Sequence, residues 1–299
     1  GTDGYNELTV LCLRAATGRR RPNLQLHVTE EMPEEVWNAA FDSLSSGSGL
    51  PALYDDGRFT RALEAADLGI APEDLPWRNG GGCTETMIHG RSNVGYLPLI
   101  LTELLESVVN SGEEINEFED LISRFEAAVR SAVEEVTGQV NAYQAIRAQL
   151  RPQPVRSLLI DDCIERALDF NAGGARYNWS VVNVAGLANV ADSLEALRVE
   201  VFENEASDLA TVVEALRSDF RGFEAVRSRL SAYPKFGNDV ASVDAIARRA
   251  ATCVFNALLA QPCWRGGRFL GSCLMFVTYA MAGEPVGATP DGRGAGAGA

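Results

Sequence analysis

A cysteine and a carboxylate lie two residues apart in a glycine-rich stretch, residues 78–93, which reads Arg-Asn-Gly-Gly-Gly-Cys-Thr-Glu-Thr-Met-Ile-His-Gly-Arg-Ser-Asn. Three consecutive glycines indicate a loop that bends sharply or passes close to another group, and we expect it to present Cys83 and Glu85 outward. If the segment is locally extended, both side chains point to the same side, which places a thiol beside a carboxylate. Spacing alone favours an ordinary glycine-rich turn around a buried cysteine, since Cys is among the most buried residue types.

Two other chemistries for this loop are disfavoured by its sequence. A cysteine hydrolase would pair Cys83 with His27 or His89, the two histidines of the chain. Cys83 and His89 share one short loop, however, and no orienting group is evident. A nucleotide-binding loop would need the pattern Gly-x4-Gly-Lys-Ser/Thr, which residues 80–91 lack.

The loop resembles the cysteine finger of the glycyl radical enzymes, the pyruvate formate-lyase-like family, in which a Gly-Cys-x-Glu motif carries a catalytic cysteine and a catalytic acid or base. Other segments resemble family motifs in the same order along the chain, and together they identify it as a member of this family. Two of them precede the loop, at residues 21–24 and 47–56. Five follow it, at residues 159–165, 173–178, 186–194, 235–239 and 287–293.

The resemblance implies both a fold and a mechanism. The fold would be α/β, the second part of a ten-stranded barrel made of two parallel five-stranded halves and surrounded by helices. A backbone glycyl radical, installed by an S-adenosylmethionine iron-sulfur activase, would generate a thiyl radical on Cys83. Glu85 would serve as general acid or base. No other cofactor and no metal are implied, and the full-length protein is expected to be a homodimer acting on a small-molecule substrate.

The residues around Cys83 separate the subclasses of the family. Formate C-acetyltransferases carry two adjacent cysteines, whereas Gly82 and Thr84 flank Cys83 here. We therefore predict a lyase or dehydratase that eliminates across a C–O, C–N or C–S bond of a small hydroxylated substrate. A formate C-acetyltransferase-like or arylacetate decarboxylase activity is the alternative within the family. Outside it, the alternative is a non-catalytic barrel remnant or partner-binding protein.

The chain departs from the family at its ends. The radical-bearing glycine belongs to an Arg-Val-x-Gly-Tyr motif, which this sequence lacks, and neither Gly4-Tyr5 nor Gly95-Tyr96 has the preceding residues. We therefore expect an internal fragment, inactive alone, with residues 1–293 forming part of the barrel domain. Residues 294–299 are a low-complexity Gly/Ala tail that we expect not to fold.

Composition excludes several classes of function. The formal charge of −15 argues against nucleic acid as a partner, and no apolar run or signal pattern predicts a membrane protein or an exported one. We expect a cytoplasmic protein whose six cysteines are reduced. Their spacing matches no zinc site, and we expect Cys12 and Cys163 to be core residues.

Hydrophobic periodicity predicts alternating helices and strands, and hence parallel pairing. The expected strands are residues 23–29, 51–54, 177–187 and 268–281. The expected helices are residues 6–17, 33–43, 58–66, 97–110, 116–150, 192–201, 207–220, 223–230 and 243–259. Residues 157–170 are expected to begin as a strand and become helical. Asn178 and Asn183 lie among apolar residues of one expected strand, where they either satisfy nearby backbone or line a cavity, so they are weak substrate-binding candidates.

Overall fold

A computed structural model describes residues 4–19, 21–81, 84–273 and 283–298. The chain divides into two compact units, Gly1–Ser92 and Asn93–Ala299. Each unit has its own buried apolar cluster, and the two are described separately below.

The first unit begins with alternating helices and strands, as the periodicity predicts. They are α1 (Glu7–Ala16), β1 (Gln25–Val28), α2 (Glu34–Ser45), β2 (Ala52–Asp55) and α3 (Asp56–Ala65). Strands β1 and β2 pair in parallel, with Gln25 opposite Ala52. Helix α1 starts where the Asn6 side chain accepts a hydrogen bond from the Thr9 amide, 3.2 Å away. The parallel pairing confirms the prediction drawn from element order.

The core of this unit lies between α1, α2 and β1. Val10 and Leu13 of α1 pack with Leu26 of β1 and with one face of α2 that includes Val36 and Ala40. Cys12 lies on the other side of α1 and is exposed. The prediction that Cys12 is a core residue is therefore wrong, because the buried face of the helix passes through its neighbours Val10 and Leu13.

The first unit ends in an antiparallel hairpin that the sequence did not predict. A 3-10 turn, Leu75–Trp77, leads into β3 (Arg78–Gly81), which pairs with β4 (Glu85–Ile88). The glycine run Gly80–Gly82 gives no alternating hydrophobic pattern, so its strand character was invisible to periodicity. Residues 78–81 and 85–88 of the expected loop are therefore paired strands.

The second unit is built on a three-stranded sheet ordered β5-β6-β7. Its strands are β5 (Ser92–Ile100), which begins at the boundary between the units, β6 (Tyr177–Ala185) and β7 (Phe269–Cys273). Strands β6 and β7 pair in parallel, with Ser180 opposite Phe269. Strand β6 is buried along nearly its whole length, as a central strand covered on both faces should be.

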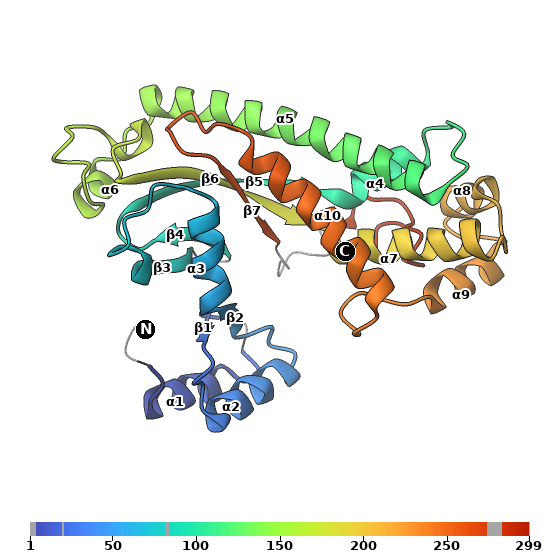
Figure 1. Ribbon diagram of the computed structural model, residues 1–299, viewed down its shortest axis with the longest axis horizontal. Helices are drawn as coiled ribbons and strands as arrows, with labels where there is room; N and C mark the ends of the chain where they lie inside the picture. The colour runs from blue at the N-terminus through green and yellow to red at the C-terminus, as the bar shows by residue number, and fades with distance from the viewer. Residues whose placement is uncertain (1–3, 20, 82–83, 274–282, 299) are drawn as a thin grey trace. The chain divides into compact units, whose positions relative to one another are not determined.

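Helices account for most of the second unit (Figure 1). The long α5 and α10 pack against each other, and α10 also contacts α7 and β7. The fully buried side chains at these contacts include Phe125, Leu194, Val254 and Phe269. The helices are α4 (Leu101–Val109), α5 (Phe118–Leu150), α6 (Pro154–Leu159), α7 (Leu187–Leu197), α8 (Leu209–Arg217), α9 (Glu224–Ala232) and α10 (Ala241–Leu259), with a 3-10 turn at Phe170–Ala172 and a π-helical turn at Arg198–Glu203.

Three expectations for this unit need correction. The helix predicted over residues 97–110 begins only at Leu101, because the apolar run before it belongs to strand β5, and an apolar run alone does not distinguish strand from helix. Residues 157–170 form the end of α6 and then turns, with positive φ at Asp162 and Ala167. The tail is also folded over its described residues 294–298, where the Ala295 amide donates to Asp219 and Arg293 binds the carbonyl of Ala297.

Candidate active site

The β3–β4 hairpin carries the motif that the sequence singles out. Gly81 lies opposite Glu85 across the two strands, and residues 82–83, including the predicted catalytic Cys83, lie outside the described residues. Glu85 is buried, with 8% of its surface exposed, so the expectation that the loop presents it outward is wrong. A buried carboxylate at the start of β4 remains compatible with general acid or base chemistry.

The backbone of the hairpin is held by contacts with other parts of the first unit. Gln25 of β1 donates a hydrogen bond from Nε2 to the Gly80 carbonyl, 2.8 Å away. Gly80 also lies under the Tyr54 ring, so closely that an added Cβ would be 2.2 Å from the Tyr54 hydroxyl oxygen. At the other end of the hairpin, the His89 amide donates to the Trp77 carbonyl at 2.9 Å. These contacts fix the strands on either side of the motif.

A charged group at the carboxyl ends of β1 and β2 supports the same hairpin. Asp56 accepts from His27 Nδ1 at 2.6 Å and pairs with Arg78, the first residue of β3, also at 2.6 Å. Tyr54 stacks on the His27 ring, with centroids 5.6 Å apart. Asp56 therefore joins the parallel strand pair to the strand that leads into Cys83.

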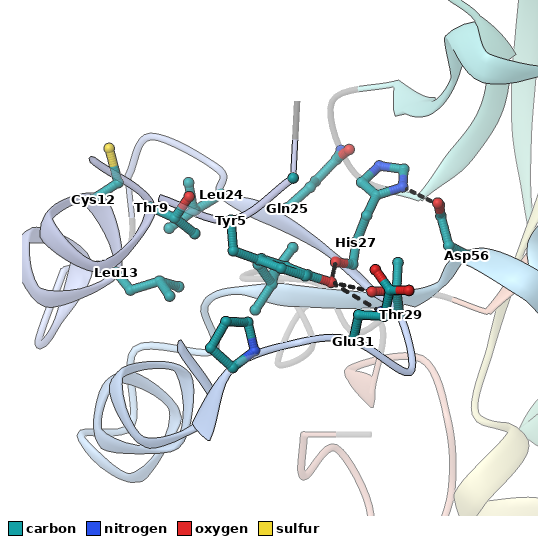
Figure 2. Close-up of a pocket in the computed structure, with 13 residues that line it drawn as sticks. Tyr5, Thr9, Cys12, Leu13, Leu24, Gln25, His27, Thr29, Glu31 and Asp56 are labelled. Atoms are coloured by element: carbon teal, nitrogen blue, oxygen red, sulfur yellow. Dashed lines mark hydrogen bonds and ion pairs between the residues drawn. The ribbon is translucent and has the colours of Figure 1, made fainter. Parts of the chain in front are cut away.

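A cavity of about 570 Å³ opens beside His27 (Figure 2). Tyr5 borders it and donates from its hydroxyl to the His27 carbonyl at 2.8 Å. His27 thus has the orienting carboxylate that a cysteine hydrolase would need, whereas His89 is exposed. Asp56 is shared with Arg78, however, so the contact also has a purely structural explanation as an ion-pair network.

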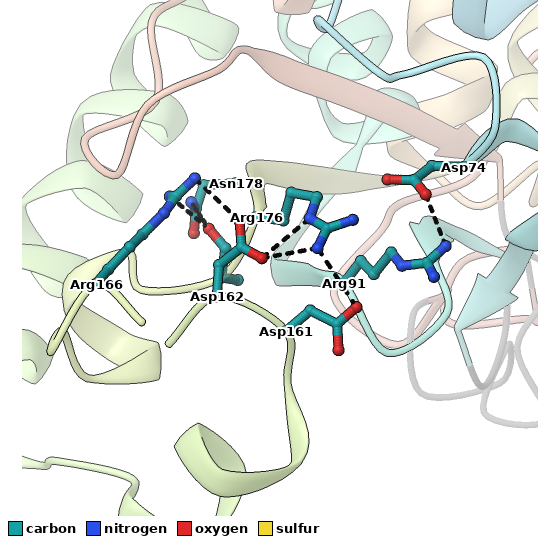
Figure 3. Close-up of polar contacts among 8 residues, drawn as sticks. Asp74, Arg91, Asp161, Asp162, Arg166, Arg176 and Asn178 are labelled. Atoms are coloured by element: carbon teal, nitrogen blue, oxygen red, sulfur yellow. Dashed lines mark hydrogen bonds and ion pairs between the residues drawn. The ribbon is translucent and has the colours of Figure 1, made fainter. Parts of the chain in front are cut away.

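Ion pairs stabilise turns in each unit (Figure 3). In the first unit, Arg91 binds the nearly buried Asp74 at 2.7 Å and lies over the Trp77 ring. In the second unit, Asp162 contacts Arg176 at 2.8 Å and Arg166 at 3.4 Å. These pairs close the turns on which the sequence motifs lie.

The two candidate asparagines occupy different environments in β6. Asn178 donates from Nδ2 to the carbonyls of Gly173 and Ala175, at 3.1 and 2.9 Å, so it fastens the turn that precedes its own strand. Asn183 is buried and lies opposite Ser272 of β7. Asn178 therefore bonds to nearby backbone, which is one of the two alternatives predicted for it. A substrate-binding role for Asn178 or Asn183 stays a prediction.

The sequence did not single out the residues that support the hairpin. Tyr54 and Asp56 lay within the noted segment 47–56 and Arg78 within the stretch 78–93, but none of them was assigned a supporting role, and Gln25 lay in no noted motif. Within the described ranges, no three His, Cys, Asp or Glu side chains are grouped so that they could hold a metal ion. None of the described helices has the length and apolarity that a membrane span requires.

Comparison with known proteins decides the family. A family model described as pyruvate formate lyase-like matches residues 1–283. The chain belongs to the pyruvate formate lyase-like family. Trans-4-hydroxy-L-proline dehydratase of Clostridioides difficile is 27% identical over 98% of this chain and 39% of its own length.

Solved structures agree on the fold. The glycerol-bound B12-independent glycerol dehydratase of Clostridium butyricum superposes with a TM-score of 0.85 at 27% identity, over 99% of this chain and 40% of that one. A glycyl radical enzyme from Archaeoglobus fulgidus gives 0.83 at 28% identity, over 97% and 39%. The chain is therefore part of the family's α/β barrel, as predicted, and spans about 40% of the length of these relatives.

Proposed function

We propose that this chain supplies the cysteine finger of a glycyl radical lyase or dehydratase that acts on a small hydroxylated molecule. The observation that carries the proposal is the Gly-Cys-x-Glu motif on a hairpin whose glutamate is buried and whose first strand, β3, is anchored at Arg78 and Gly80. Its membership in the family and its similarity to two dehydratases support this assignment.

Cys83 acts through its sulfur as a hydrogen-atom carrier. In the complete protein, a glycyl radical installed by an S-adenosylmethionine iron-sulfur activase would supply the radical chemistry, and the Cys83 thiol would give up its hydrogen atom to it. The Cys83 sulfur then takes a hydrogen atom from a substrate carbon, so that an S–H bond forms as a C–H bond breaks. This role does not require a thiolate, unlike nucleophilic cysteine catalysis, but it does require that water be kept from the reacting groups.

Glu85 moves the proton that elimination requires. Its carboxylate accepts a proton from a hydroxyl next to the substrate radical as the neighbouring leaving group departs, and in its protonated form it can assist that departure. The burial of Glu85 suits this role, because proton transfer in elimination is best shielded from bulk water. The hydrogen held by Cys83 then returns to the product radical.

The test separates the two residues by isotope exchange. The protein that joins this chain to its radical-bearing segment is activated anaerobically and incubated with candidate diols and hydroxylated amino acids in D2O. Glu85→Gln should form no product but should still incorporate deuterium into recovered substrate, because the Cys83 thiol exchanges its hydrogen with solvent. Cys83→Ser should show the glycyl radical by spin resonance but neither exchange nor product.

A matched control is the exposed Cys12→Ser, which should keep full activity. Full turnover by Cys83→Ser would refute the role of Cys83. Full turnover by Glu85→Gln would refute only the role of Glu85 and would favour a decarboxylase-like member of the family. Activity on an ester in air, dependent on His27, would instead favour a cysteine hydrolase.

A further inference from the structure

A second cavity lies wholly within the second unit and has an unusual charge. It measures about 530 Å³ and is bordered by β5, α5, the 3-10 turn Phe170–Ala172 and the loop before β7. Three arginines line it, Arg147, Arg156 and Arg265, and no Asp or Glu appears among its described lining residues. The chain carries 41 acidic residues against 26 basic ones, so three arginines gathered without a carboxylate require an explanation.

Arg265 and Arg147 are partly buried, whereas Arg156 is exposed. Burial lowers the pKa of the Arg265 guanidinium, and the nearby charge of Arg147 lowers it further, while the Cys263 thiol beside it acts in the opposite direction. Its Nη2 donates to the Trp179 carbonyl at 3.2 Å, but its Nε is buried without a hydrogen-bond partner. A buried cation with an unpaired donor is costly, and an anion in the cavity would offset its charge.

Aromatic rings cover the faces of the Arg147 and Arg156 guanidinium groups, which leaves the N–H donors at the guanidinium edges available to a ligand. The Arg147 guanidinium lies 5.5 Å from the centre of the Tyr143 ring, and that of Arg156 lies 5.5 Å from the centre of the Phe170 ring. Stacking of this kind orients the plane of a guanidinium without using its N–H donors. Within the described part of the chain neither side chain forms an ion pair, and the Nε of Arg147 is also buried and unpartnered.

Several other arginines of the chain form ion pairs with carboxylates. Arg229 contacts the buried Glu200 at 2.7 Å, and Arg249 contacts Glu119 and Glu126, each at 2.6 Å. The three arginines of the cavity differ from these, because no Asp or Glu is among the described residues that line it. Several guanidinium groups that line one cavity without a protein carboxylate suit phosphate, sulfate or carboxylate oxygens.

Strand β5 lets its backbone approach this group closely. An added Cβ at Gly95 would lie 2.9 Å from Gln144 Nε2 and 3.2 Å from Arg265 Nη2. Gln144 is itself fixed by a 2.6 Å hydrogen bond from Nε2 to the Ser180 hydroxyl. The floor of the cavity is thus rigid and polar, which pre-organises the arginines above it.

We propose that this cavity is a binding site for a small oxyanion, distinct in its residues from the Cys83 hairpin. Arg147 and Arg265 supply N–H donors from α5 and from the loop before β7, and Arg156 adds a third positive charge at the exposed side. The site requires no radical chemistry, so the test of this proposal does not depend on the function proposed above.

Titration of the 299-residue chain with inorganic phosphate tests the proposal. Phosphate should raise Tm above the value in sodium chloride of equal ionic strength, and calorimetry should give saturable binding to one site. Arg147→Gln and Arg265→Gln should each weaken binding at least tenfold, as expected for loss of a charge-assisted donor. The matched control is Arg151→Gln, an exposed arginine one turn further along that does not line the cavity, and it should bind phosphate as the parent does.

Arg147→Lys keeps the positive charge, so it tests phosphate binding even if the glutamine variants fail to fold. It should fold and bind phosphate more weakly than the parent, since a lysine lacks the guanidinium fork. Without phosphate, Arg147→Gln should unfold at a higher temperature than the parent, because one of two neighbouring like charges is gone. Acetate as a second titrant separates a carboxylate site from one that requires a tetrahedral anion. Equal effects of phosphate and chloride on Tm, or parental phosphate affinity in both glutamine variants, would overturn the proposal.

Discussion

Substitution of Gly80 by alanine tests whether the Cys83 hairpin is held by contact with the parallel strand pair. The added Cβ would lie 2.2 Å from the hydroxyl oxygen and 2.9 Å from Cζ of Tyr54, and 3.0 Å from Gln25 Nε2. All three distances are well below van der Waals contact. Tyr54 cannot simply swing aside, because its ring stacks on His27 and packs 5.6 Å from the ring of Phe59.

The expected cost follows from this crowding. Overpacking a fixed site costs about 1–3 kcal/mol, and displacement of Gln25 would add the loss of its hydrogen bond to Gly80, about 1 kcal/mol. We expect Gly80→Ala to lower the free energy of unfolding of the first unit by about 2–4 kcal/mol. Hydrogen exchange in peptides covering residues 72–92, together with urea unfolding, measures the change and shows where it occurs.

Two variants make the result interpretable. Gly138→Ala, on the exposed face of α5 where an added Cβ meets nothing within 4 Å, should stabilise the chain by about 0.5–1 kcal/mol, since alanine is the better helix former. Tyr54→Phe removes the atom nearest the new Cβ, so it should recover part of the loss caused by Gly80→Ala in a double-mutant cycle. A coupling energy near zero, or unchanged exchange in residues 72–92, would refute the claim that Tyr54 positions the hairpin.

Three further predictions concern the second unit. Burial opposes the charge of Glu200, but hydrogen bonds from Arg229, Ser207 and Tyr233 outweigh it and lower its pKa below the ordinary 4.5. Its stabilising contribution is therefore present above pH 4.5 and lost as the pH falls through the folded value. Glu200→Gln should cost about 1–3 kcal/mol at pH 7 and progressively less in acid, as urea unfolding at several pH values would show; a cost independent of pH would contradict the ion pair. Asn178→Asp should lower the free energy of unfolding by about 1–3 kcal/mol, since it removes the donor to two carbonyls; a parental unfolding curve would argue against the structural role. Gly174→Ala would place a Cβ 2.0 Å from the Leu168 carbonyl oxygen, and because backbone yields less than a side chain, its loss in urea should exceed that of Gly80→Ala.

The sequence predicted best those elements whose pattern is local and regular. Helix α5 was predicted within two residues at its start, because Leu121, Phe125 and Val129 recur at helical spacing. Strand β5 was misassigned because its apolar run continues without a break into α4. The boundary between them is set by pairing with β6, which no window of local sequence contains.

The residues that build both sites could not be predicted from the sequence, for a related reason. Gln25, Asp56 and Arg78 meet at the hairpin from three separate elements, and Arg147 and Arg265 meet from positions more than a hundred residues apart. An arginine carries no local signal that tells a paired side chain from one that faces a cavity. Only the fold decides which of the chain's arginines lack a carboxylate partner.

Glycines explain why the family could be recognised while the substrate could not. Gly174 and Gly292, each in a segment that carried the resemblance, allow approaches that a side chain would block, with an added Cβ 2.0 Å from Leu168 O and 1.9 Å from Ser231 Oγ. Such positions are constrained by close packing within the fold, where a larger residue would clash. Close backbone packing does not specify which side chains would contact a substrate. A resemblance built largely on close backbone approaches therefore specifies the barrel and its cysteine finger, and the molecule that enters it must be found by assay.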